Sequence, residues 1–300
     1  MSTSLVRNSL DQVSADRIRE HIRALEGVRH PVVSPDALEH AASYISDSLQ
    51  SLGYEVEPHL FCVGDREFRN IIATCPGTRQ PEERVMVLAH YDTMSSTPGA
   101  DDNASGVAVL LELARVMKSL QFERTVQFVA VNLEENERVG DPGFLGSSAL
   151  AARAKEEGWR IEGVVVLESV AYAGEAIDQK NPENLPIELP QFGNFIAVVG
   201  NQDSAELVET FSRATSRYQI SLPIQSLVVP GTGEMFPDTR RSDHSPFWDR
   251  GFKAVMVTDT CNFRNPNYHQ ATDTLETLNV AFAAEVCRAV GGAVADVAGR

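Results

Sequence analysis

The chain has 300 residues, of which 43% are hydrophobic and 23% charged, an ordinary composition for a soluble enzyme with a full core. Its net charge of −16 argues against nucleic acid as the main partner, because phosphate binding requires clustered Lys and Arg. No apolar stretch is long enough to cross a bilayer, the N-terminus lacks the apolar segment of a secretory signal, and four irregularly spaced cysteines indicate free thiols, so we expect a cytoplasmic protein without a membrane partner.

The first part of the chain predicts two helices followed by a hairpin. A helix is expected over 9–26, where Ser14 either caps it or lies within it. A second helix is expected over 35–53, because Pro is favoured at the first helical position and Gly at the end. Two strands with a Gly-Asp turn between them, 54–61 and 68–77, are typical of a hairpin.

Beyond the hairpin, strand-like and helix-like segments alternate. Residues 85–89 form a continuous apolar run, which is typical of a strand buried on both faces. The other expected strands are 125–132, 163–167, 195–200, 224–229 and 254–258. The expected helices are 104–120, 144–157, 204–217 and 278–297. The longer loops between them are 133–143, 172–194, 230–243 and 259–275.

This alternation predicts an α/β protein whose central sheet is mixed but mostly parallel, with helices on both faces. The hairpin is expected to add antiparallel strands at one edge. No internal repeat or Pro/Ser-rich linker divides the chain, so we predict a single domain over 1–300 with an N-terminal helical segment at 1–33. The loops 172–194 and 230–241 are expected to wall the pocket.

Acidic and histidine side chains follow four of the predicted strands. They are His90 and Asp92, Glu134 and Glu135, Glu168, and, in the loop after the last strand, His269 and Asp273. Asp101 and Asp102 stand at the start of a helix. Because the carboxyl ends of parallel strands meet at one edge of a sheet, these side chains are expected to converge on one cleft.

Each of these residues also has a purely structural interpretation. The two aspartates could be N-cap residues, and the pair Glu134-Glu135 could lie in a solvated loop. Glu168 is harder to dismiss, because it follows four apolar residues and an ionised Glu is rarely buried without a partner. The joint occurrence of all these groups at strand ends makes coincidence improbable.

The residue types match a metal centre. Two imidazoles and three carboxylates form a mixed nitrogen and oxygen site suited to Zn²⁺, with Mn²⁺ or Co²⁺ as possible substitutes. Two ions sharing a carboxylate and a water would acidify that water and polarise a carbonyl, and a further carboxylate would then act as general base. Asp92 is placed to hold the other ring nitrogen of His90.

At these residues the sequence resembles the co-catalytic di-zinc aminopeptidases, a family that includes leucyl aminopeptidases, glutamate carboxypeptidases, transferrin receptor and glutaminyl cyclases. The resemblance extends from about residue 34 to the C-terminus. The matching motifs are His90-Tyr91-Asp92, Gly99-Ala100-Asp101-Asp102-Asn103-Ala104-Ser105-Gly106, Glu134-Glu135, Ser242-Asp243-His244, and Arg264 to His269 with Asp273-Thr274. It implies one zinc-exopeptidase-like catalytic domain with a three-layer, phosphorylase/hydrolase-like sandwich.

The resemblance also implies a role for each residue. Asp102 would bridge two zinc ions, one completed by His90 and Glu168 and the other by Glu135 and His269. The general base acting on the bridging water would be Glu134, the oxyanion donor would be Tyr268, and the peptide bond Asp102–Asn103 would be cis. Asp101 is then expected to serve as a cap or packing residue, and Asp243 and His244 as structural support.

One departure leaves the substrate open. Many family aminopeptidases have Asp where this chain has Glu168, and that Asp helps to hold the free amine of the substrate. We expect an aminopeptidase that hydrolyses short peptides; the alternatives are a carboxypeptidase, an amidase acting on small N-acyl compounds, or, remotely, a catalytically dead binding module. A carboxypeptidase would need an arginine in the cleft, for which the candidates are Arg240, Arg241 and Arg264. The sequence does not indicate an oligomeric state.

Overall fold

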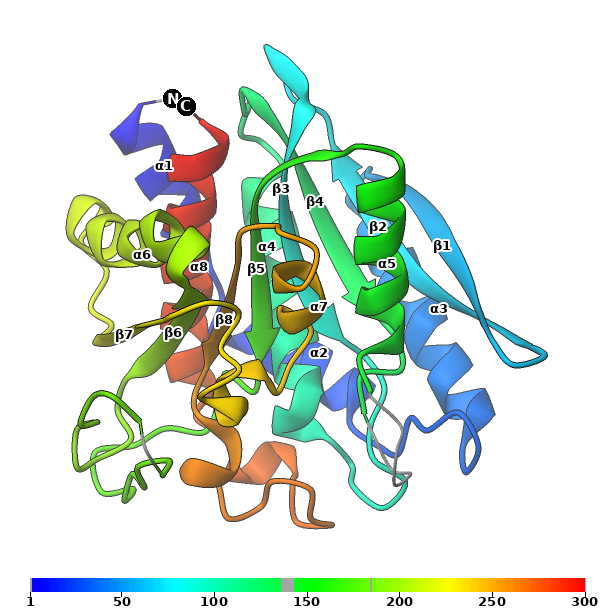
Figure 1. The fold of residues 1–300 in the computed structure, drawn as a ribbon, viewed down its shortest axis with the longest axis vertical. Coiled ribbons are helices and arrows are strands. Elements are labelled where there is room, and N and C mark those ends of the chain that lie inside the picture. The colour runs from blue at the N-terminus through cyan, green and yellow to red at the C-terminus, as the bar shows by residue number, and fades with distance from the viewer. Residues whose placement is uncertain (1, 136–142, 184, 300) are drawn as a thin grey trace.

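The computed structural model describes residues 2–135, 143–183 and 185–299, so most of the expected loop 133–143 lies outside the described residues. One eight-stranded sheet with the order β1-β2-β4-β3-β5-β8-β6-β7 runs through the molecule (Figure 1). The strands are β1 Glu55–Val63, β2 Arg66–Cys75, β3 Gln80–His90, β4 Arg124–Val131, β5 Arg160–Glu168, β6 Ile196–Asn201, β7 Ile224–Val229 and β8 Ala254–Thr258. The predicted α/β fold with a mixed sheet is confirmed.

The centre of the sheet is parallel. Strands β4, β3, β5 and β8 all run in the same direction, and their pairing places His90 beside Val131 and Glu168 beside Thr258. The hairpin β1–β2 is antiparallel and lies at one edge, as predicted. The sequence pattern did not indicate that β6 runs antiparallel to β8, because strand direction depends on how a connection crosses the sheet and not on hydrophobic pattern.

Helices cover both faces of the sheet, and each covered face has its own apolar core. On one face the helices are α1 Thr3–Leu10, α2 Ala15–Leu25, α3 Pro35–Ser51, α4 Gly106–Met117, α6 Ala205–Tyr218 and α8 Val280–Ala298. On the other face, in front of the sheet in Figure 1, lie α5 Leu145–Glu156 and α7 Ser245–Trp248. Short helical turns occupy Gln202–Ser204, Pro237–Arg240, Cys261–Phe263 and Leu275–Thr277.

The single helix predicted over 9–26 is wrong, because two helices meet there. The backbone leaves the helical conformation at Ser14, whose side chain accepts a hydrogen bond from the amide of Arg17 and caps α2. The amide of Ser14 donates to the buried carboxylate of Glu112 on α4 at 2.7 Å. A long-range partner therefore sets this boundary, and local sequence spacing does not reveal it.

Candidate metal centre

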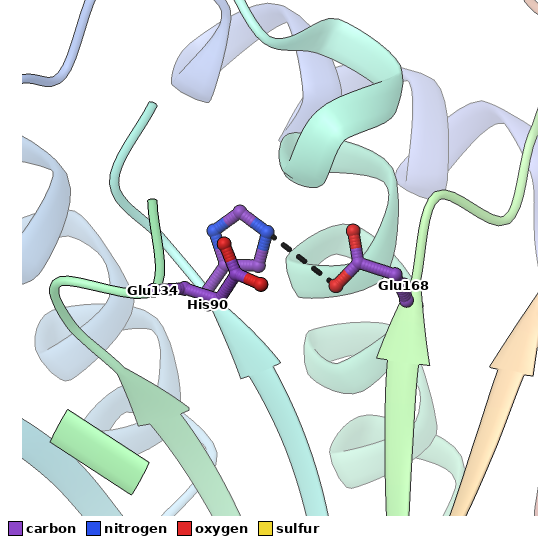
Figure 2. Close-up of side chains that lie close together, drawn as sticks. All are labelled: His90, Glu134 and Glu168. Atoms are coloured by element: carbon purple, nitrogen blue, oxygen red, sulfur yellow. Dashed lines mark ion pairs between the residues drawn. The ribbon is translucent and has the colours of Figure 1, made fainter. Parts of the chain in front are cut away.

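The candidate site lies at the carboxyl ends of the central strands. His90 is the last residue of β3 and is fully buried. Its Nε2 atom lies 3.1 Å from Asp102 Oδ1 and 3.6 Å from Glu168 Oε2. Glu168 is the last residue of the neighbouring strand β5. Figure 2 shows the imidazole of His90 directed towards the Glu168 carboxylate, with the carboxylate of Glu134 beside it. Three side chains from three strand ends thus meet at one point.

Asp102 joins this group to a second one. Its Oδ1 atom faces His90, while its Oδ2 atom lies 3.2 Å from Nε2 of His269. The same Nε2 atom lies 3.3 Å from Glu135 Oε2. The carboxylate of Asp102 therefore stands between two histidines, and each histidine has a glutamate as a further neighbour.

Glu134 lies close enough to His90 and Glu168 for its carboxylate to bind the same ion. Potential ligand atoms of His90, Glu134 and Glu168 all lie within 4.8 Å of one another, as do those of Asp102, Glu135 and His269. Geometry alone would thus allow Glu134 to be a ligand. Asp102 Oδ1 already supplies a third donor atom beside His90 and Glu168. The carboxylate of Glu134 is therefore not needed as a metal ligand at this position.

Burial makes this cluster of acids unfavourable without added positive charge. Burial and the charge of Asp102 raise the pKa of Glu135 to about 7, and burial also raises the pKa of Glu134 and of Glu168. Burial would lower the pKa of His269, but the carboxylates of Asp102 and Glu135 raise it to about 10. A bound cation would relieve the repulsion among these carboxylates.

The donor set fits such a cation. Glu135 Oε1 and His269 Nε2 are buried atoms without a hydrogen-bond partner among the described residues, and both belong to one group of potential ligands. Buried polar atoms are normally paired, so these two atoms are suited to bind a cation. Imidazole nitrogen with carboxylate oxygen is a donor set that Zn²⁺ accepts.

The loop that carries Asp102 is shaped by the glycines at its ends. Gly99 has a φ of 60°, and a Cβ atom there would clash with the carbonyl oxygen of Asp102. A Cβ atom at Gly106 would clash with the side chain of Asn103. The peptide bond Asp102–Asn103 is cis, as the resemblance predicted.

Hydrogen bonds anchor the same loop to its surroundings. Asn103 Nδ2 donates to the carbonyl of Leu167 at 2.8 Å, and its Oδ1 accepts from the amide of Ser169 at 3.1 Å. The two carboxylate oxygens of Asp273 accept from the amides of Asp101 and Asp102 at 2.9 and 3.1 Å. Asp273, which the sequence placed near the cleft, therefore holds the backbone of Asp102.

Asp101 points away from the metal-binding atoms. Its carboxylate accepts from the amide of Ala171 at 3.0 Å and from Asn265 Nδ2 at 2.8 Å. These bonds connect the loop after β3 with the loops that follow β5 and β8. Asp101 thus has a packing function and does not cap a helix.

Asp92 contacts the backbone of both glutamates as well as His90. Its Oδ1 and Oδ2 atoms accept from the amides of Glu134 and Glu135, each at 3.1 Å. The distance from Asp92 Oδ1 to His90 Nδ1 is 3.6 Å, longer than a hydrogen bond. The carboxylate expected to orient His90 therefore also fixes the turn on which Glu134 and Glu135 stand.

Arg29 is a buried cation beneath the site that the sequence did not reveal. Its guanidinium donates to the carbonyl oxygens of Leu25, Gly27, Tyr91, Pro98 and Gly99. Burial lowers its pKa to about 10, while the nearby carboxylates of Asp92 and Asp273 oppose that shift. No motif could have identified this arginine, since all its acceptors are backbone atoms.

The Ser242-Asp243-His244 segment lies beside Glu168 and supports it. Ser242 Oγ donates to Glu168 Oε2 at 2.7 Å, and Asp243 accepts a hydrogen bond from Ser147 at 2.5 Å. His244 Nε2 lies 2.7 Å from the carbonyl of Thr239. Of the three, Ser242 is the residue that directly contacts a potential metal ligand.

Tyr268 lies between His269 and an apolar pocket. Its ring stacks on that of His269 with centroids 3.9 Å apart, and Arg241 Nη2 donates to its hydroxyl at 3.4 Å. The pocket comprises about 670 Å³ including its open mouth. Its walls come from the loops 172–194, 230–243 and 259–275 and from β6, β7 and β8. They include Leu185, Leu189, Leu227, Met256, Phe263 and Tyr268.

The other two candidate arginines do not reach this pocket. Arg240 forms a bidentate ion pair with Asp249, with both distances at 2.8 Å. Arg264 is buried and donates to the carbonyl of Phe195 at 2.9 Å. Of the three arginines proposed from the sequence, only Arg241 lines the pocket.

Comparison with known proteins identifies the family. The profile described as "Peptidase family M28" matches residues 70–294, more than half of the chain. The chain belongs to peptidase family M28. The protein YfbL of Escherichia coli (strain K12) is 32% identical over 289 residues, covering 91% of this chain and 85% of its own. The resemblance inferred from the motifs is thereby confirmed, as is the prediction of an enzyme.

One further relative of the M28 chain and one solved structure of similar fold carry names that describe an activity. Leucine aminopeptidase 1 of Arthroderma otae is 29% identical over 243 residues, and the match covers 76% of this chain and 58% of that longer protein. The structure of BSAP, described as a zinc aminopeptidase from Bacillus subtilis, superposes with a TM-score of 0.72 at 16% identity and covers 95% of both chains. The latter likeness concerns the fold.

Proposed function

We propose that this M28 peptidase is an aminopeptidase that binds two zinc ions and removes the first residue of short peptides. The observation that carries the proposal is the position of Asp102, whose two oxygens face two different histidines. A carboxylate so placed could be shared by two ions, as two-metal hydrolases require. The names of the fungal relative and of the Bacillus structure support the same activity.

The ligands we assign are His90 and Glu168 for one ion, Glu135 and His269 for the other, and Asp102 for both. Zinc at these positions would acidify a water molecule and polarise the scissile carbonyl. Glu134 accepts a proton from the attacking water as the water oxygen bonds to the carbonyl carbon. It then delivers that proton to the leaving nitrogen as the C–N bond breaks.

Tyr268 and the apolar pocket place the substrate. The hydroxyl of Tyr268, beside Arg241, donates to the oxygen on which negative charge develops. The pocket receives the side chain of the N-terminal residue, and its Leu, Met and Phe walls favour a large apolar one. The free amine of that residue is held on the side of Glu168, whose carboxylate is oriented by Ser242.

The proposal predicts a strong dependence on the free amine. Leucine p-nitroanilide should be hydrolysed with a kcat/KM about 100-fold above that of its N-acetyl derivative, because acetylation removes a charge-assisted hydrogen bond. Release of p-nitroaniline measures both rates. If the two substrates are hydrolysed equally well the aminopeptidase assignment is wrong, and a preference for the acetylated one would favour the amidase alternative.

Metal content should follow the assignment of ligands. We expect close to two zinc ions per chain after equilibrium dialysis, about one in His269→Ala, and close to none in Asp102→Ala, which loses a donor to both ions. Elemental analysis of folded protein gives these numbers directly. One ion in the unsubstituted chain and none in His269→Ala would indicate a single-metal site.

The four cysteines, Cys62, Cys75, Cys261 and Cys287, are all free thiols, which is consistent with a reducing compartment such as the cytoplasm. No helix within the described residues has the length and apolar character needed to span a membrane. Short peptides are the partners that the site can accommodate.

A further inference from the structure

A second hollow borders the metal centre on the flank opposite the apolar pocket. It comprises about 1110 Å³ including its open mouth, and its lining includes Val33, Arg66, Phe68, Asp92, Leu133 and Glu135. The apolar pocket lies towards β8, β6 and β7, whereas this hollow lies towards the hairpin β1–β2. The strands that carry His90, Glu134 and Glu168 stand between them.

The position of this hollow indicates that it binds the leaving group of the substrate. The N-terminal residue of the substrate lies on the Glu168 side in the proposed function. The peptide therefore continues past Glu134 and Glu135, where the leaving nitrogen receives its proton. Because Glu135 and Asp92 line the hollow, the second residue of the substrate enters it.

Arg66 is a cation that lines this hollow. Its Nη2 atom donates to the carbonyl of Pro31 at 2.8 Å, and its guanidinium carbon lies 5.0 Å from the centroid of the Phe68 ring. Within the described part of the chain, Arg66 forms no ion pair, although the protein carries a net charge of −16. These contacts leave the remaining donors of an exposed guanidinium available to a ligand.

We propose that Arg66 binds the free α-carboxylate of the second residue, so that dipeptides are the preferred substrates. This inference rests on the proposed aminopeptidase function. A planar guanidinium matches a carboxylate in geometry and in charge. The carboxylate therefore has its favourable position beside Arg66.

The walls of the hollow also define the side chain of the second residue. The lining of the hollow includes the apolar side chains of Val33, Val63, Phe68, Leu133 and Leu145. Such a surface favours an apolar second residue over a charged one. Two sites with apolar walls and a cation in the second of them together suit a dipeptide such as Leu-Leu.

The test compares three substrates in two variants. The unsubstituted enzyme should hydrolyse Leu-Leu with a kcat/KM about 10-fold above that of Leu-Leu-amide. Leucine release measures both rates, counted as two leucines for each Leu-Leu cleaved and one for each amide. Arg66→Gln retains a donor for the Pro31 carbonyl but loses the charge. It should raise the KM for Leu-Leu about 10-fold, while leucine p-nitroanilide, which has no carboxylate, is hydrolysed at an unchanged rate.

A matched control removes an arginine elsewhere. Arg213→Gln, on α6 beside Glu209, should leave all three substrates unaffected. If Leu-Leu and its amide are equivalent while leucine p-nitroanilide is cleaved, the role of Arg66 is refuted and the aminopeptidase function stands. An equal loss for all three substrates in Arg66→Gln would show that the arginine only supports the segment around Pro31. Failure to hydrolyse any of them would overturn the proposed function itself.

Discussion

Glu134→Gln is expected to lower kcat about 10³-fold for every peptide substrate while both zinc ions remain bound. The amide keeps the shape of the carboxylate but cannot accept the proton of the attacking water, and general base catalysis contributes about 10²–10⁴-fold. The backbone of the turn should not move, because the amides of Glu134 and Glu135 still donate to Asp92. Steady-state rates together with elemental analysis of the same sample measure both quantities.

The neighbouring residue provides the matched control for that experiment. Glu135→Gln alters the same turn, but there the lost charge belongs to a proposed ligand, so we expect metal to be lost along with activity. Glu134 lies close enough to His90 and Glu168 to bind an ion itself. If Glu134→Gln loses one zinc ion, Glu134 is a ligand and another residue must be the base.

The sequence predicted most of the fold because hydrophobic periodicity and chain order determine it. The buried run 85–89 lies within β3, and the alternation of strands and helices matches the parallel centre of the sheet. Two features were not predicted. The break at Ser14 depends on Glu112, about a hundred residues away, and the antiparallel direction of β6 depends on a crossover that leaves no periodic signal.

The candidate ligands could also be selected from the sequence, since they lie at the ends of parallel strands or in the loops that follow them at the same edge. What surrounds them could not. Arg29 acts through backbone carbonyls, Ser242 through one hydrogen bond to Glu168, and Arg66 lies in a hollow formed by distant segments. Of these, only Ser242 lay in a motif. Residues that act on backbone atoms, or on a cavity wall, have no spacing by which a sequence reveals them.

The bonds of Asp92 show why the supporting residues matter to the chemistry. One carboxylate holds the amides of Glu134, the proposed base, and of Glu135, a proposed ligand. The same group lies near Nδ1 of His90, a proposed ligand of the other ion. The relative positions of base and ligands are therefore set by a residue that need not touch the substrate, and that residue is in turn balanced by the charge of Arg29.

Arg29→Met is expected to lower the free energy of unfolding by about 3–5 kcal/mol, the range found when one member of a buried charged group is removed. The substitution removes one hydrogen-bond donor from each of the five carbonyls that Arg29 contacts, and it removes a buried positive charge near the carboxylates of Asp92 and Asp273. Urea denaturation of the metal-free protein measures the loss without a contribution from zinc binding.

Two comparison variants separate the causes of that loss. Arg29→Lys keeps the charge but cannot reach all five carbonyls, so it should lower the free energy of unfolding by less than Arg29→Met does. The Lys variant can still be measured if the Met variant does not fold. Arg79→Met removes an arginine whose side chain is 73% exposed and pairs with Glu123, and it should cost less than about 1 kcal/mol. A loss in Arg29→Met no larger than that of Arg79→Met would mean that the carbonyls and acids around Arg29 are satisfied by water. In that case the cation beneath the metal centre would not be required for folding.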